Sequence, residues 1–146
     1  MSINIILGIS NILGIPSVIV SKNFIFSILV GFTITFSTLH HYTETNEVGH
    51  KLKGCTIPYI HNNGEILRYL DISFAILTTI YIIYKLKPIN SLLVIKKYKY
   101  FFIIGLSSSF LCDFIVKDAK YYLFLHLTWH ITIYYILYKV ALILPK

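Results

Sequence analysis

Long apolar runs, separated by short polar breaks, follow one another along almost the whole chain. An α-helix needs about 20 mostly apolar residues to cross the hydrocarbon core of a bilayer, and most of the runs approach this length. They cover residues 3–20, 24–42, 66–84, 100–116 and 121–144. The pattern predicts an all-α, polytopic transmembrane bundle of about five spanning helices, and nothing in it divides residues 1–146 into more than one domain.

Three stretches depart from this simple pattern. The first run contains Gly8, Gly14 and Pro16, which disfavour a regular helix interior. Residues 43–65 form a polar loop between the second and third runs. Residues 89–95 are apolar but too few to span a bilayer, so we predict that they lie at the membrane interface.

The amino-acid composition supports a membrane environment. Hydrophobic residues make up 56% of the chain and charged residues 13%, which is roughly half the charged share of an average soluble domain. A soluble domain of this size could not bury so much apolar surface. We therefore expect membrane lipids to surround the helices, and the sequence indicates neither a protein partner nor an organelle.

The formal net charge of +7 is distributed unevenly along the chain. A basic protein can bind nucleic acid, but here most of the basic residues lie in segments that carry no acidic residue. The positive-inside rule produces this asymmetry at the cytoplasmic ends of spanning helices, so no nucleic-acid partner is expected. The residues in these segments are Lys22, Lys85, Lys87, Lys96, Lys97, Lys99, Lys139 and Lys146.

These basic segments set the predicted topology. They follow the first run, follow the third run and end the chain, so about five spans place all of them on one side. We predict an exoplasmic N-terminus, retained because the first run lacks the features of a signal peptide, and a cytoplasmic C-terminus. Cys55 and Cys112 then lie toward the exoplasmic side, where a disulfide between them and two separate thiols are equally compatible with the sequence.

Four ionisable residues fall inside the predicted spans: His41, Asp71, His126 and His130. Such groups cost about 2.5–3.5 kcal/mol near the centre of a bilayer, so each requires a partner or a function. Ser37 precedes His41 by four residues, and His126 precedes His130 by four, so each pair shares one helix face.

The predicted topology brings these residues to one depth. The second helix runs outward and ends near His41, whereas the third and fifth run inward and carry Asp71, His126 and His130 in their first turns. All four residues are therefore predicted in the exoplasmic half of the bilayer. Three imidazoles and a water molecule form a typical catalytic zinc site, and Asp71 is placed to orient that water or to act as a general base.

Simpler interpretations of the same residues remain open. A histidine pair at this spacing can occur by chance, and His40 and His41 could contact lipid headgroups at the interface. Asp71 could form an ion pair with Arg68, one turn away. Packing, interfacial or solvent-facing roles are expected for the other polar residues: His50, His61, Ser107, Ser108, Ser109, Asp113 and Trp129.

In order along the chain, the motifs are SxxxH at Ser37 and His41, an aspartate at Asp71, and HxxxH at His126 and His130. This set resembles the CREST superfamily, which includes the alkaline ceramidases, the progestin and adiponectin receptors with haemolysin III, and the GPI-anchor phospholipase and myomaker group. The exoplasmic N-terminus, the His-Tyr-Thr-Glu continuation and the long loop are most similar to the last group. The family has seven helices, so this chain resembles a version shortened by two, with the parity of the topology retained.

The resemblance implies a chemistry. In the family, the three histidines bind Zn²⁺ while the serine and the aspartate lie beside the ion, and members hydrolyse an amide or ester bond in a lipid. The implied function here is a zinc-dependent membrane hydrolase in which Asp71 orients or deprotonates water and Ser37 stabilises the water or the oxyanion.

Two other classes of function are considered. One is a non-enzymatic, myomaker-like membrane-remodelling or fusion protein that retains a structural zinc site. The other is a small b-type cytochrome with haem held between histidines of facing helices.

Overall fold

The computed structural model describes residues 3–43, 64–114 and 119–146. Nearly all of these residues are helical, and no strand occurs among them. The all-α prediction is therefore confirmed. In chain order the elements are α1 (Ile3–Ser10), the 3₁₀ helix η1 (Asn11–Gly14), α2 (Ile15–Val20), α3 (Phe24–Thr43), α5 (Gly64–Lys97), α6 (Lys99–Phe114) and α7 (Ala119–Ile143).

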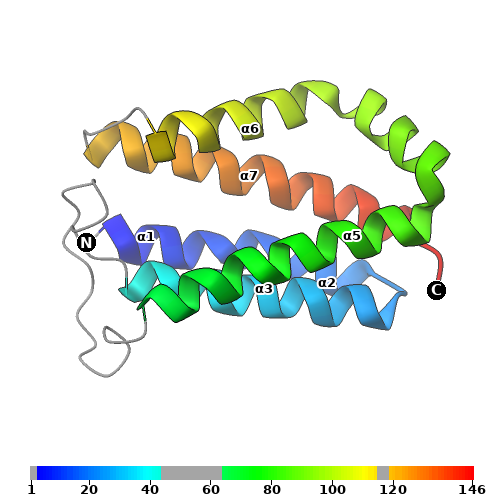
Figure 1. Cartoon of the computed structure of the whole chain (residues 1–146), viewed down its shortest axis with the longest axis horizontal. Helices are drawn as coiled ribbons and strands as arrows, with labels where there is room; N and C mark the ends of the chain where they lie inside the picture. Colours follow the sequence, from blue (N-terminus) through cyan, green and yellow to red (C-terminus); the bar gives the residue numbers. More distant parts are fainter. Residues whose placement is uncertain (1–2, 44–63, 115–118) are drawn as a thin grey trace.

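The helices lie along one long axis, and successive passes run in alternate directions (Figure 1). The first pass consists of α1, η1 and α2 in line, and it contacts both α3 and α7. Helix α5 packs chiefly against α3, while α6 packs chiefly against α7. The first pass therefore joins two helix pairs into one bundle.

The first pass is divided at η1, where the sequence analysis expected a single run. Pro16 lies in the first turn of α2, where its missing N–H group costs no intrahelical hydrogen bond. Gly14 lies against α3 and α7, because a Cβ atom at this position would come within 2.6 Å of the Tyr134 ring and 2.7 Å of Ile34. Pro16 is thus compatible with the start of α2, and Gly14 allows this segment to pack closely against α3 and α7.

Helix α5 bends at Lys87, which has φ 62° and ψ 154°. The residue before a proline is disfavoured in the helical region, and Pro88 follows directly. The segment 89–95, predicted as an interfacial patch, is helical and leads from the bend into α6 (Figure 1).

Lys87 adopts a backbone conformation that glycine adopts without strain, so we expect glycine at this position to stabilise the protein. Replacing Lys87 with glycine is expected to raise the free energy of unfolding by about 1–3 kcal/mol, because the strained φ costs glycine nothing. Thermal unfolding of the purified protein in detergent measures the change. The matched variant Lys96→Gly, at an exposed helical position, is expected to lose up to about 1 kcal/mol. A loss of stability in both variants would contradict the prediction.

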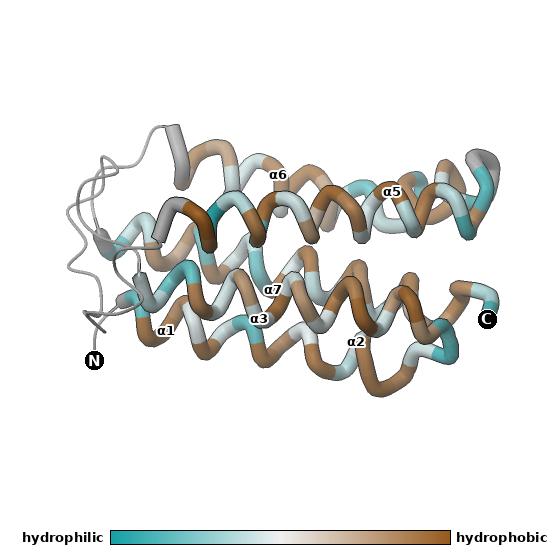
Figure 2. Tube along the Cα trace, turned by 60° about the horizontal axis from the view of Figure 1, so that its bottom comes forward, coloured by the Kyte–Doolittle hydropathy of each residue, from teal (hydrophilic) through white to brown (hydrophobic). Residues whose placement is uncertain are grey.

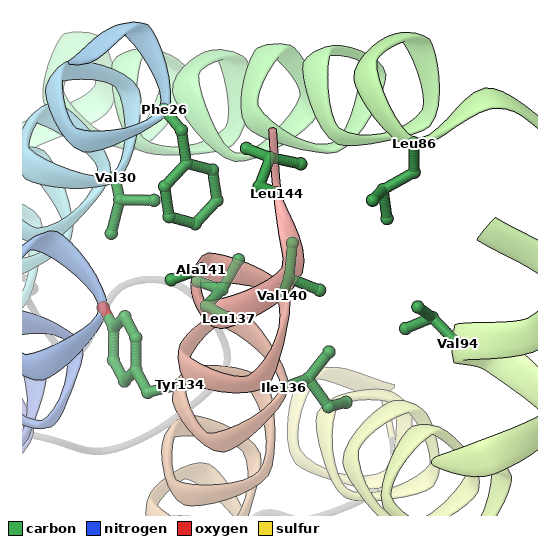
Figure 3. Close-up of a cluster of buried hydrophobic side chains, with 10 residues drawn as sticks. All are labelled: Phe26, Val30, Leu86, Val94, Tyr134, Ile136, Leu137, Val140, Ala141 and Leu144. Carbon is green, nitrogen blue, oxygen red and sulfur yellow. The ribbon is translucent and has the colours of Figure 1, made fainter. Parts of the chain in front are cut away.

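The main apolar core lies around the C-terminal half of α7 (Figure 3). It combines residues of α3, α5 and α7 with the end of the chain: Phe26, Val30, Leu86, Val94, Tyr134, Ile136, Leu137, Val140, Ala141 and Leu144. A smaller cluster of Leu7, Cys112 and Tyr122 joins α1, α6 and α7. The candidate site described below lies on the same face of α7, between the two clusters.

Buried Asn23 ties three parts of the chain together. Its Oδ1 accepts hydrogen bonds from the Phe26 N–H at 2.9 Å and from the Tyr81 hydroxyl at 2.8 Å. Its Nδ2 donates to the Pro145 carbonyl at 2.7 Å. The start of α3, the middle of α5 and the C-terminus are therefore held at a common position.

Many large apolar side chains are exposed on the bundle, and apolar residues recur along its helices (Figure 2). Side chains such as Phe24 and Ile19 are 77% and 75% exposed. Two helical segments, Phe24–Thr43 and Ile66–Lys87, are long and apolar enough to cross a membrane, and the apolar segments Asn4–Val20 and Lys99–Cys112 are shorter. These features support membrane association, while the five-span count and the orientation stay predictions.

Candidate metal centre

Three histidines from two helices meet inside the bundle. His41 lies near the end of α3, and His126 and His130 lie on α7. One nitrogen from each ring can be chosen so that all three lie within 4.8 Å of one another. The ring centroids are 4.7 Å apart for His41 and His126, 5.3 Å for His41 and His130, and 4.8 Å for His126 and His130.

The burial of these rings tests the simpler interpretation of His41. His41 and His130 are only 2% and 3% exposed, and His126 is half-buried. The interpretation of His41 as a headgroup contact is therefore wrong, because its ring is enclosed by protein. The spacing of four residues places both histidines of α7 on one face.

Asp71 and Ser37 complete the set of predicted site residues. The buried Ser37 side chain and His41 both lie close enough to Asp71 of α5 to favour its carboxylate electrostatically. Arg68 is exposed, and the groups that act on Asp71 are His41 and Ser37 rather than Arg68. No ion pair joins Arg68 to Asp71 in the described part of the chain, so the alternative in which Arg68 satisfies Asp71 is not supported.

Two further residues contact the Nδ1 atoms of the two histidines on α7. Ser10 Oγ at the end of α1 lies 2.5 Å from His130 Nδ1, and Cys112 Sγ of α6 lies 3.4 Å from His126 Nδ1. From the sequence, Cys112 was expected only as a disulfide partner or a separate thiol, and Ser10 had no expected role. Neither residue belongs to a local motif with its histidine, so no sequence signal marked it.

Tyr122 and Tyr134 extend the histidine row on α7 in both directions at the same spacing of four residues. The Tyr122 ring lies 5.3 Å from His126, and the Tyr134 ring lies 5.8 Å from His130. The Tyr134 hydroxyl donates a 2.5 Å hydrogen bond to Oδ1 of the fully buried Asn11. The repeated spacing could have identified these tyrosines from the sequence.

Some of the predicted features fall elsewhere or outside the described residues. Trp129 lies at packing distance from Gly105 of α6, where a Cβ atom would be 3.4 Å from its ring, which confirms the packing interpretation of Trp129. Cys55, His50 and His61 lie outside the described residues, and so does the possible pairing of Cys55 with Cys112.

The donor set suits a transition-metal ion. A tetrahedral zinc ion with Zn–N bonds of about 2.0–2.1 Å needs ligand nitrogens about 3.4 Å apart, and the nitrogens here lie within 4.8 Å of one another, so they would have to move closer to share an ion. Imidazole also binds copper, iron and nickel, so the donor set alone does not select zinc. The haem interpretation is disfavoured, because rings already in contact leave no space for a porphyrin between them.

Comparisons of the chain with protein-family models, curated proteins and solved structures find no significant match. The resemblance to the CREST superfamily thus rests on the ordered residues from Ser37 to His130, and it stays a prediction. The geometry of the site is independent of that resemblance.

Proposed function

We propose that the protein is a zinc-dependent integral membrane hydrolase that cleaves an amide or ester bond in a lipid. The observation that carries the proposal is the largely buried cluster of His41, His126 and His130, with Asp71 and Ser37 close beside it. A site of this polarity within an apolar bundle requires a function, because buried polar groups are costly without one.

The three histidines would hold the ion through neutral nitrogens. Zinc in such a site polarises a carbonyl group and makes water acidic enough to act as a nucleophile near neutral pH. Asp71 accepts the proton of the attacking water and returns it to the leaving amine or alcohol. Ser37 orients the Asp71 carboxylate in the free protein and donates a hydrogen bond to the developing oxyanion when substrate is bound.

The proposal includes about five spanning passes, with the site in the exoplasmic half of the bilayer. Support comes from the direction of the passes and from the charge distribution. The bend of α5 and the C-terminus lie at one end of the bundle, while α1 begins at the other end (Figure 1). The basic segments around Lys85, Lys97 and Lys146 thus follow the arrangement that the positive-inside rule favours at the cytoplasmic side.

Turnover of lipids by the purified protein tests the hydrolase. Wild-type protein in detergent, loaded with zinc, is expected to release fatty acid from a panel of amide-linked and ester-linked lipids, as measured by mass spectrometry. Asp71→Asn is expected to lose about 10²–10⁴-fold in rate while retaining zinc, because it removes the proton acceptor and leaves the three imidazoles in place. The exposed Arg68→Gln variant, one turn away, should keep the wild-type rate.

The burial of the histidines inside the bundle supports a second candidate function. The low exposure of His41 and His130 suits a structural zinc site in a non-enzymatic membrane-remodelling or fusion protein. In that case wild-type and Asp71→Asn proteins both lack turnover, and zinc removal lowers the unfolding temperature of both. Turnover by the wild type that Asp71→Asn abolishes would exclude this alternative.

A further inference from the structure

The hydroxyl of Ser10 contacts two groups, a carbonyl oxygen that can only accept a hydrogen bond and a ring nitrogen that can donate or accept one. Its Oγ lies 2.6 Å from the Leu7 carbonyl oxygen and 2.5 Å from His130 Nδ1. A carbonyl oxygen carries no proton, so the single hydroxyl proton of Ser10 is donated to Leu7. The proton between Ser10 and His130 must then belong to the imidazole, and Ser10 accepts it.

Cys112 repeats this arrangement with a thiol. Its Sγ donates toward the Tyr122 carbonyl oxygen at 3.7 Å and lies 3.4 Å from His126 Nδ1. When the thiol proton points at the carbonyl, the sulfur is available to accept the Nδ1 proton of His126, and this is the direction that we infer. Cys112 is fully buried, so water does not compete for this contact.

These contacts determine which nitrogen of each ring can bind a metal ion. A neutral imidazole carries one proton, so a ring protonated at Nδ1 has its lone pair at Nε2. Histidines that bind metals almost always donate their other ring N–H to an acceptor, which fixes the tautomer and the ring orientation. Here the acceptors come from α1 and α6, the two helices that pack against α7 beside the histidine row.

We propose that Ser10 and Cys112 are positioning residues of the metal centre, holding His130 and His126 in the tautomer that presents Nε2 to the ion. This inference rests on the proposed zinc site and extends it to the N-terminal helix, which contributes no metal ligand itself. It also assigns Cys112 a role as hydrogen-bond acceptor rather than as a sulfur ligand.

Two measurements on the full-length protein in detergent test the proposal. The zinc affinity is measured by competition with a chromophoric chelator, and the histidine tautomers are measured by ¹⁵N NMR of the side chains in zinc-free protein. Ser10→Ala and Cys112→Ala are each expected to weaken zinc binding by about 10–100-fold. In zinc-free wild type both α7 histidines should carry the proton on Nδ1, and each variant should lose that preference at its own histidine only.

Conservative variants and a control variant distinguish a loss of histidine positioning from a general loss of protein stability. Cys112→Ser and Ser10→Cys keep an acceptor and should restore most of the zinc affinity. Ser17→Ala removes a fully buried hydroxyl from the same pass, and that hydroxyl has no hydrogen-bond partner in the described part of the chain. It should leave both the affinity and the tautomers unchanged.

The outcomes distinguish this inference from the proposed function. Wild-type protein that binds no zinc would overturn the zinc site, while the tautomers of the zinc-free protein would still decide the positioning role. Zinc binding by the wild type, with Ser10→Ala and Cys112→Ala indistinguishable from Ser17→Ala in affinity and tautomer, would overturn the positioning role alone.

Discussion

The double variant His126→Ala/His130→Ala is expected to purify without zinc, whereas the wild-type protein is expected to purify with one zinc ion per chain. Zinc held by a protein site contributes an apparent binding free energy of about 10–16 kcal/mol at neutral pH in structural examples. The double variant keeps only His41 of the three clustered imidazoles, so nearly all of this free energy is lost. Elemental mass spectrometry of the purified proteins, normalised to protein concentration, measures the stoichiometry.

His40→Ala serves as the control for this experiment. His40 is adjacent to His41 in the sequence, but it is half-buried and lies outside the group of three histidines that come within metal-binding distance. We expect this variant to retain one zinc ion per chain. Loss of zinc from His40→Ala with retention in the double variant would contradict the assignment of the ligands.

Replacing Gly14 with alanine is expected to destabilise the bundle by about 1–3 kcal/mol, the usual cost of overpacking. The added Cβ would lie 2.6 Å from the Tyr134 ring and 2.7 Å from Ile34. At least one of η1, α3 and α7, which carry these residues, must therefore shift. Tyr134 hydrogen-bonds to Asn11, which belongs to the same 3₁₀ helix η1 as Gly14, and this bond limits how far the Tyr134 ring can shift. Thermal unfolding in detergent should show a lower midpoint for the variant.

Gly31→Ala provides the matched comparison, because no atom lies within 4 Å of the Cβ position that it would create. Gly31 is inside helix α3, where alanine is favoured over glycine by roughly 0.5–1 kcal/mol. The Gly31 variant is therefore expected to unfold at a slightly higher temperature than the wild type. Equal effects of the two substitutions would show that Gly14 does not mark a close contact.

The sequence predicts the features that depend on local periodicity. Apolar run length predicts the helices, and Pro88 accounts for the bend at Lys87. The spacing of four residues places Ser37 with His41 and His126 with His130 on shared faces. The alternating direction of the helices then predicts that these pairs approach Asp71, and the structure brings all five residues into one region.

The features that sequence analysis missed depend on contacts between distant segments. Ser10 and His130 are separated by 120 residues, and Asn11 and Tyr134 by 123. A serine or asparagine in an apolar run carries no information about the partner that will satisfy it. Sequence proximity was also a poor guide for Arg68, which is one turn from Asp71 on the same helix yet forms no ion pair with it in the described part of the chain.

X-ray absorption spectroscopy at the zinc edge of the purified wild-type protein tests the central claim most directly. We expect one zinc ion per chain whose nearest neighbours are nitrogen or oxygen atoms at about 2.0–2.1 Å. The spectrum should also show scattering from the more distant ring atoms of three coordinated imidazoles. A sulfur neighbour at about 2.3 Å, or protein without bound zinc, would contradict the claim that His41, His126 and His130 share the ion.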